Sequence, residues 1–179
     1  MKKFLIAFAA IALSATSAYA NSDFDGLYLG ANGAYSSNKV KEGNRKGGFA
    51  GEVISGYGIT FDNMYVGAEA HVGKRSGSNT VKGIKVKQNH NYGITGRVGV
   101  LMSPKVLTYG AVGYERASLS DNAGGKAKID GIKFGVGGET FVKKNLTARS
   151  EFSMTKWNKN DFYKGGNEFR TTIGLAVHF

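Results

Sequence analysis

The most constraining feature of this chain is a period-two alternation of apolar and polar residues that runs from Gly26 to Phe179. Successive side chains of a β-strand point to opposite faces, so this period predicts strands and not helices. Each alternating segment is long enough to cross a membrane as a strand, which takes roughly 9–11 residues. Eight strands are therefore expected, over residues 26–36, 48–61, 64–75, 88–102, 106–118, 129–141, 146–156 and 167–179.

Charged residues inside these segments fall on the face opposite the apolar residues. In the segment 64–75, Val72 lies on one face while Glu69 and His71 lie on the other. An apolar exterior around a polar interior is the pattern of a transmembrane barrel. A soluble β-sandwich also alternates, and the sequence leaves that fold open as the alternative. Asp130 breaks the pattern, so the lipid-facing part of its segment is expected to begin after it.

The expected inner face carries charges of both signs. Because side chains fill the interior of a small barrel, these charges are expected to pair as a buried network, which is costly to break. A narrow ion path is the functional alternative for the same residues. The expected network comprises Glu52, Glu69, Arg97, Glu139, Arg149, Glu151 and Arg170.

Short and long connections alternate strictly along the chain. The short ones are 61–63, 103–105 and 142–145, and the long polar ones lie near 37–47, 74–88, 118–128 and 157–167. Outer-membrane barrels have long outer loops, short periplasmic turns and aromatic residues at both interfaces. Aromatic residues gather at both expected strand ends: Tyr35, Phe49, Tyr92, Tyr114 and Phe169 at the long-loop end, Phe61 and Phe179 at the other. We therefore expect a monomeric all-β domain, an eight-stranded antiparallel up-and-down transmembrane β-barrel.

The first twenty residues have the three regions of a secretory signal. A basic start precedes the apolar run Phe4 to Leu13, and Ala18-Tyr19-Ala20 supplies an A-x-A cleavage pattern. Ten apolar residues are too few to span a bilayer as a helix, which takes about 20. Residues 1–20 are thus predicted to be a cleavable signal peptide, and residues 21–179 to be the barrel domain.

Basic charge is concentrated in the expected outer loops. Without residues 1–20 the net charge is +9, and the loop ranges 36–48, 74–88, 115–128 and 156–168 together hold +10. Clustered like charge attracts polyanions, here lipopolysaccharide, sulfated glycans or an acidic host surface. The alternative is that the lysines only keep the loops solvated and neutralise nearby lipid phosphates. The candidate ligand-binding residues are Lys39, Lys41, Arg45, Lys46, Lys74, Arg75, Lys82, Lys85 and Lys87.

Motifs for catalysis and metal binding are missing from the sequence. The chain has no cysteine, which excludes disulfides and thiolate sites, and its three histidines show no metal-binding spacing. We expect neither enzyme activity nor a metal or resident cofactor, and the secretory signal makes nucleic acid an improbable partner. Haem remains an alternative ligand, because His90 or Tyr92 at the outer rim could ligate iron.

Three short segments, Gly26 to Gly30, Gly96 to Val100 and Tyr109 to Tyr114, carry a resemblance to known proteins. They resemble strands of the outer-membrane protein β-barrel domain family, the small eight-stranded barrels of Gram-negative bacteria of the OmpA, OmpX and Ail type. The ending 174–179, with Gly174, Val177 and the terminal Phe179, resembles the signal read by the barrel-assembly machinery. The resemblance implies a bacterial outer membrane location, contact with its lipids and lipopolysaccharide, and assembly by that machinery.

Together these observations predict a structural and surface-interaction protein that presents basic extracellular loops to polyanions, in the manner of an adhesion protein. A haem-binding surface protein is the first alternative and a narrow porin the second. The sequence carries no motif that identifies one physiological ligand.

Overall fold

The computed structural model describes residues 22–39, 46–76, 78–81, 84–120, 126–158 and 166–179. The predicted signal peptide therefore lies outside the described residues. Within the described part, no helix is long and apolar enough to cross a membrane. The described residues form nine strands: β1 (Gly26–Lys39), β2 (Lys46–Phe61), β3 (Met64–Ser76), β4 (Ser78–Val81), β5 (Ile84–Ser103), β6 (Val106–Ser120), β7 (Lys126–Lys143), β8 (Leu146–Trp157) and β9 (Gly166–His178).

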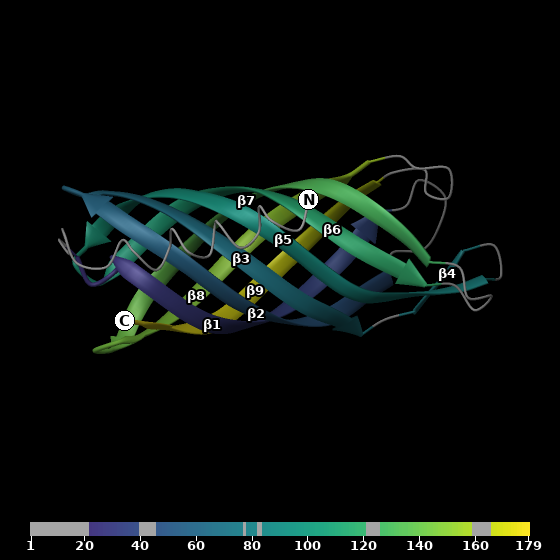
Figure 1. The fold of residues 1–179 in the computed structure, drawn as a ribbon, viewed down its shortest axis with the longest axis horizontal. Helices are drawn as coiled ribbons and strands as arrows, with labels where there is room; N and C mark the ends of the chain where they lie inside the picture. The colour runs from purple at the N-terminus through teal and green to yellow at the C-terminus, as the bar shows by residue number, and fades with distance from the viewer. Residues whose placement is uncertain (1–21, 40–45, 77, 82–83, 121–125, 159–165) are drawn as a thin grey trace, which may run out of the picture.

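Eight of these described strands close a barrel (Figure 1). Each pairs antiparallel with its neighbour along the chain, β1 pairs with β9, and β3 pairs with β5 to complete the ring. The short β4 pairs only with the start of β5, above the ring. The predicted eight-stranded antiparallel up-and-down barrel is confirmed.

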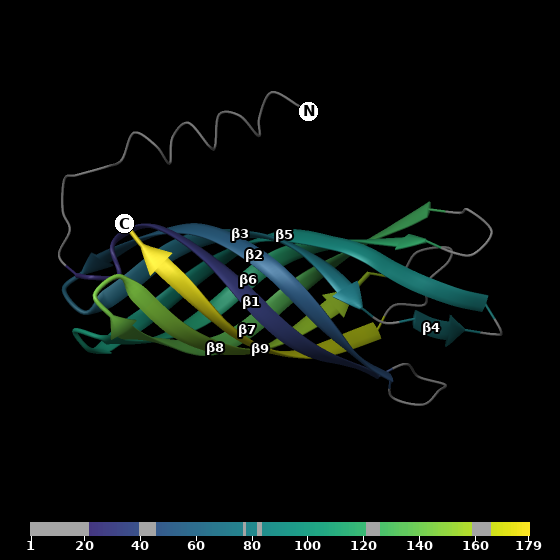
Figure 2. The ribbon, with the colours of Figure 1, turned by 90° about the horizontal axis from the view of Figure 1, so that it is seen from below.

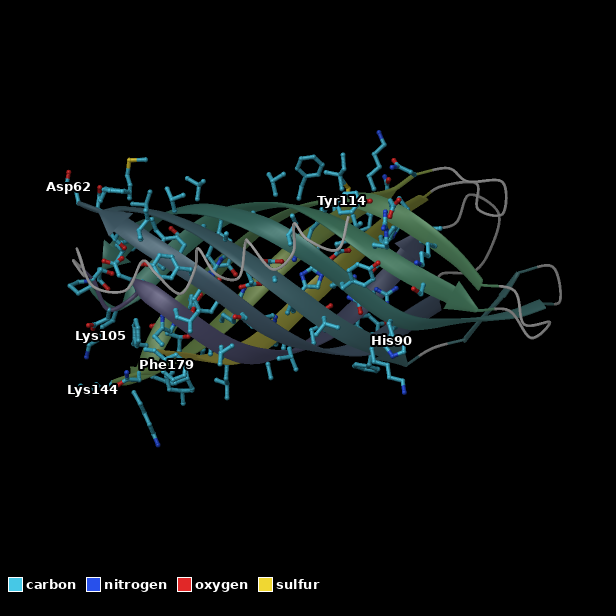
Figure 3. All side chains as sticks on the ribbon, viewed as in Figure 1. Asp62, His90, Lys105, Tyr114, Lys144 and Phe179 are labelled. Atoms are coloured by element: carbon cyan, nitrogen blue, oxygen red, sulfur yellow. The ribbon has the colours of Figure 1, made fainter. Side chains whose placement is uncertain are left out.

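Apolar side chains cover the outside of the barrel and charged side chains fill the inside (Figure 3). Val53, Ile94 and Ile173 are 59%, 66% and 68% exposed, whereas Arg97 and Arg170 are each 1% exposed. A soluble β-sandwich would bury the first group and expose the second, so that alternative is wrong. Apolar side chains outside and charged side chains inside are expected of a barrel that is surrounded by lipid.

The strands are longer at the long-loop end than the alternation predicts. β5 begins at Ile84, not at residue 88, and β6 extends to Ser120. β7 begins at Lys126, three residues before its expected start. The cause is that β5, β6 and β7 stay paired beyond the aromatic residues Tyr92 and Tyr114 at the long-loop end. The paired segments there have the polar composition of loops.

The opposite end of the barrel has short turns and is closed by a buried aromatic side chain. Figure 3 places Asp62, Lys105 and Lys144 at this end, together with Phe179. Asp62 has a positive φ of 54°, which a tight two-residue turn requires and which Asp tolerates better than most residues. Just before β1, Phe24 turns back under the barrel and is fully buried, with its ring 4.7 Å from that of Phe141. Phe24 thus closes the short-turn end of the lumen.

Candidate functional site

The lumen contains two groups of paired charges, one above the other. The group near the short turns, the turn-side cluster, is centred on Arg97 of β5. Its guanidinium donates to Glu139 at 2.6 Å and to the Tyr28 hydroxyl at 3.0 Å, and lies 3.8 Å from the centre of the Tyr109 ring. Arg149 donates to Glu69 at 2.6 Å. The turn-side cluster comprises Tyr28, Tyr65, Glu69, Arg97, Tyr109, Glu139, Thr147, Arg149 and His178.

The group near the long loops, the loop-side cluster, is centred on Arg170 of β9. Its guanidinium lies 3.0 Å from carboxylate oxygens of both Glu52 and Glu115 and 3.1 Å from Glu168. Trp157 donates its indole N–H to Glu168 at 3.1 Å. The loop-side cluster comprises Ser36, Glu52, Arg75, Asn91, Glu115, Thr155, Trp157, Glu168 and Arg170.

The structure pairs all seven residues that the sequence assigns to the lumen. It adds four more charges: Arg75, Glu115, Lys133 and Glu168. The eleven charged side chains are each at most 7% exposed, and six carboxylates face five cations. Near-balance of charge is what allows so many ions to be buried, because an unpaired buried charge carries a large desolvation cost.

Three of the added residues come from segments that the sequence analysis counts as loop. Glu115 and Glu168 lie inside β6 and β9 and are 0% and 1% exposed. Arg75, a predicted ligand-binding residue, instead points into the lumen mouth, where it binds Glu168 and donates to the Ser36 hydroxyl at 2.9 Å. All three also lie inside the predicted strands 64–75, 106–118 and 167–179, where the alternation gives them inward parity, so the loop ranges overlapped the strand ends.

Inward-facing glycines leave room for the large side chains of the lumen, because they have no Cβ atom. A Cβ atom at Gly56 would overlap the Tyr28 ring, and one at Gly58 would overlap the Tyr65 ring. Glycine on the inner face thus faces bulky neighbours, as the sequence analysis infers from its frequency there.

Those of the other predicted ligand-binding residues that the structure describes belong to strand segments at the long-loop end. Lys74 is exposed on the outer face of β3. Lys39 and Lys46 are terminal residues of β1 and β2, and Lys85 and Lys87 belong to β5. Lys41, Arg45 and Lys82 lie outside the described residues.

The two residues considered for haem lie on the outer face of β5. His90 and Tyr92 are both exposed, and Figure 3 shows His90 toward the long-loop end. Arg116 of β6 pairs with Tyr92 and donates to the Tyr114 hydroxyl at 3.0 Å and to Asp130 of β7. In the described ranges, no three His, Asp or Glu side chains form a group that could hold a metal ion.

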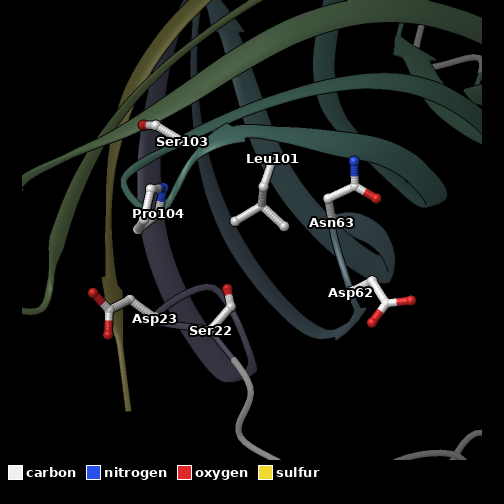
Figure 4. Close-up of a pocket in the computed structure, with 7 residues that line it drawn as sticks. All are labelled: Ser22, Asp23, Asp62, Asn63, Leu101, Ser103 and Pro104. Atoms are coloured by element: carbon white, nitrogen blue, oxygen red, sulfur yellow. The ribbon is translucent and has the colours of Figure 1, made fainter.

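A cavity of about 400 Å³ opens at the short-turn end (Figure 4). It lies between the N-terminal turn and the turns that follow β2 and β5. Its lining is mostly polar and mostly exposed: Ser22, Asp23, Asp62, Asn63, Leu101, Ser103 and Pro104. Its lining residue Leu101 packs against the buried group that includes Tyr65 and Tyr109, and the cavity lies at the end of the barrel opposite the long loops.

The predicted assembly-signal residues belong to the closing seam between β9 and β1. Val177 and Phe179 are exposed on the outer wall, and the Phe179 N–H donates to the Leu27 carbonyl at 2.9 Å. Gly174 faces inward against Asn32, where a Cβ would overlap the amide. The outward residues of this ending are thus accessible from the membrane side of the seam.

Comparison with family models finds a match to "Outer membrane protein beta-barrel domain" over residues 6–179. A 22 kDa outer membrane protein of Rhizobium leguminosarum bv. viciae is 30% identical over 166 residues, covering 87% of this chain and 78% of that protein. A 25 kDa outer-membrane immunogenic protein of Brucella canis is 25% identical over 157 residues, covering 84% of this chain and 71% of that protein.

Solved structures with the same fold include two surface barrels. Neisserial surface protein A superposes with a TM-score of 0.61 at 18% identity, covering 86% of this chain and 97% of that chain. Ail of Yersinia pestis, in complex with the heparin analogue sucrose octasulfate, superposes with a TM-score of 0.60 at 17% identity, covering 87% of this chain and 99% of that chain. At these identities the likeness concerns the fold.

Proposed function

Because this chain belongs to the outer membrane protein beta-barrel domain family and is a barrel of the bacterial outer membrane, we propose that it acts as a surface-interaction protein whose basic long-loop end attracts polyanions. The partner chemistry is phosphate or sulfate displayed on a carbohydrate, as in lipopolysaccharide or a sulfated glycan. The observation that carries this proposal is the separation of charge between the lumen and the long-loop end.

The structure sharpens that separation. Moving Arg75, Glu115 and Glu168 from the loops into the lumen removes one cation and two anions from the loop count, so the loop charge rises from +10 to +11. The lumen charges are paired with one another and nearly neutral. The uncompensated charge of the molecule therefore lies where it meets the medium beyond the membrane, and such a field raises the encounter rate with anions.

The composition of the basic region favours charge attraction over a shaped pocket. Lysines outnumber arginines in the long-loop segments, and a lysine ammonium acts as a point charge without the fork geometry of a guanidinium. That Ail was crystallised with a heparin analogue supports the idea that a barrel of this fold can present sulfate-binding groups.

The proposal includes that the protein has a structural role and neither catalyses a reaction nor conducts ions. The relatives and neighbours compared above are outer-membrane and surface barrels, not enzymes. The paired charges occupy the lumen as a plug, which argues against the narrow porin of the sequence analysis; a planar-bilayer recording without discrete conductance is the expected result. Haem binding gains no specific support, and a haem titration without a Soret shift is expected.

The test compares two triple variants with equal loss of charge. One replaces Lys82, Lys85 and Lys87 with Ser, and the control replaces the short-turn residues Lys105, Lys143 and Lys144 with Ser. Arg75 is kept in both, because it belongs to the lumen. Heparin and lipopolysaccharide binding to the refolded barrel is measured at two salt concentrations. We expect weaker, less salt-dependent binding in the first variant alone, and equal loss in both variants would refute loop-end recognition.

A further inference from the structure

A belt of small residues separates the two charge clusters of the lumen. On β1, Asn32 lies between Tyr28 of the turn-side cluster and Ser36 of the loop-side cluster, and all three are buried on the inner face. β3, β5, β6, β8 and β9 also contribute to both clusters. We call the inward residues between the clusters on these strands the central belt: Gly30, Asn32, Ala34, His71, Gly73, Gly93, Thr95, Ala111, Gly113, Glu151, Ser153, Thr172, Gly174 and Ala176.

Side chains fill the barrel least at the level of the central belt. All of its residues except Asn32, His71 and Glu151 are Gly, Ala, Ser or Thr, whereas the clusters on either side are built mainly from Arg, Glu, Tyr and Trp. Glu151 is held by Lys133 at 2.7 Å. The interior of a small barrel is just wide enough for side chains to fill or for one small ligand. Small inward residues at one level therefore leave room for a small molecule.

Four buried polar atoms of the central belt have no hydrogen-bond partner among the described residues. They are Asn32 Oδ1, His71 Nε2, Thr95 Oγ1 and Ser153 Oγ, and none of these residues is more than 7% exposed. His71 Nε2 lies 3.5 Å from Glu115 Oε1, which is long for a hydrogen bond. Roughly nine in ten buried polar groups are paired with protein or with ordered water, because an unpaired one costs stability.

Strand register explains why the protein leaves these atoms without a partner. Each of the four residues lies directly opposite a glycine, in the pairs Asn32–Gly174, His71–Gly93, Thr95–Gly113 and Ser153–Gly135. A glycine has no side chain that donates or accepts. A Cβ atom at Gly113 would overlap the Thr95 hydroxyl, and one at Gly174 would overlap the Asn32 amide. A larger residue at either position therefore could not supply the missing partner.

Apolar side chains close the lumen on both sides of the central belt. Toward the short turns this is the buried cluster around Phe24 and Leu107, and toward the long loops it is the cluster of Ala117, Ile129 and Trp157. Strand pairing is continuous around the ring, and Figure 2 shows this wall from below. A molecule in the central belt is therefore enclosed and does not belong to an open channel.

We propose that the central belt binds a small cluster of water molecules, held by Asn32, His71, Thr95 and Ser153. The ligand must be small because the site is enclosed. It must also donate and accept hydrogen bonds, because Asn32 Oδ1 only accepts whereas the two hydroxyls do both. Water meets both conditions, and a buried water typically makes about three hydrogen bonds. The ion-paired clusters above and below remain the plug, and this site does not depend on polyanion binding at the long-loop end.

Replacing a hydroxyl by a methyl group distinguishes a water-bound oxygen from an unpaired one. Thr95→Val keeps the shape of the side chain and removes Oγ1. Removing an unpaired buried hydroxyl raises the urea midpoint of unfolding, whereas removing one that binds water loses hydrogen bonds and lowers it. We expect a lower midpoint for Thr95→Val, and an unchanged or higher one for the control Thr171→Val on the lipid-facing side of β9. A higher midpoint for Thr95→Val would overturn the proposal.

Nuclear magnetic resonance detects the water directly in the unsubstituted barrel. Methyl groups of Ala and Thr are labelled in an otherwise deuterated chain, in nanodiscs of deuterated lipid. Cross-relaxation from water is expected at the inward methyl groups of Ala34, Thr95 and Thr172, and not at those of the outward residues Ala31 and Ala70. Absence of water signals at all three inward methyl groups would overturn the proposal, whatever the variants show.

A small cation is the competing occupant, because six lumen carboxylates face five cations. Urea unfolding is therefore repeated with sodium replaced by N-methylglucamine, which is too large for the belt, at equal ionic strength. An unchanged midpoint is expected for bound water. A lower midpoint in the original chain, absent from Thr95→Val, would overturn the assignment to water.

Discussion

Removing the central cation of the loop-side cluster tests whether paired charges fill this part of the lumen and exclude water from it. Arg170 lies within 3.1 Å of three carboxylates, those of Glu52, Glu115 and Glu168. Its side chain is 1% exposed, and theirs are at most 5% exposed. Arg170→Met leaves these carboxylates with fewer cations in a medium that solvates them poorly. Breaking a buried pair in this way costs about 3–5 kcal/mol of unfolding free energy, against about 0.2–1 kcal/mol for an exposed pair.

The chain supplies its own probe for this measurement. Trp157 is its one tryptophan, and the indole donates to Glu168 in the same cluster. Urea unfolding in phospholipid vesicles, followed by tryptophan emission, gives the free energy of each variant. The triple variant that adds Glu52→Gln and Glu115→Gln removes most of the stranded charge and is expected to recover much of the loss. A cost below about 1 kcal/mol for Arg170→Met would refute the plug, because it would mean that water already screens these charges.

Three further outcomes are expected. Phe24→Ala should lower the unfolding free energy by about 3 kcal/mol, since a fully buried ring is lost, and urea titration measures it. Asp130→Asn should change stability by less than about 1 kcal/mol in the same titration, because its pair with Arg116 is about one-third exposed. Gly56→Leu should abolish the compact band of the folded barrel in unheated electrophoresis, since any Cβ there overlaps Tyr28; a normal band would contradict the packing.

Sequence alternation alone was sufficient to predict the number of strands in the barrel ring and the orientation of its faces, but it did not predict the short β4, which lies in an expected loop. The reason is that the side-chain period of a strand is two, so a single charged residue such as Glu69 or Arg97 determines the face of its whole segment. The alternation of long and short connections predicted which end of the barrel faces the outside of the cell. The seven predicted lumen residues are all buried for the same reason, since inward parity in a closed small barrel means burial.

Pairing partners and strand ends were decided only by the tertiary structure. Arg170 and Glu52 are 118 residues apart in sequence, and closure of the ring brings them together. Polar composition does not show where a strand ends and a loop begins, so Arg75 and Glu168 were counted with the loop charge although they lie at predicted strand ends and face the lumen. The register shift between Gln88 and His90 likewise has no sequence signature, because it exists only as a mismatch between β5 and its partner β6.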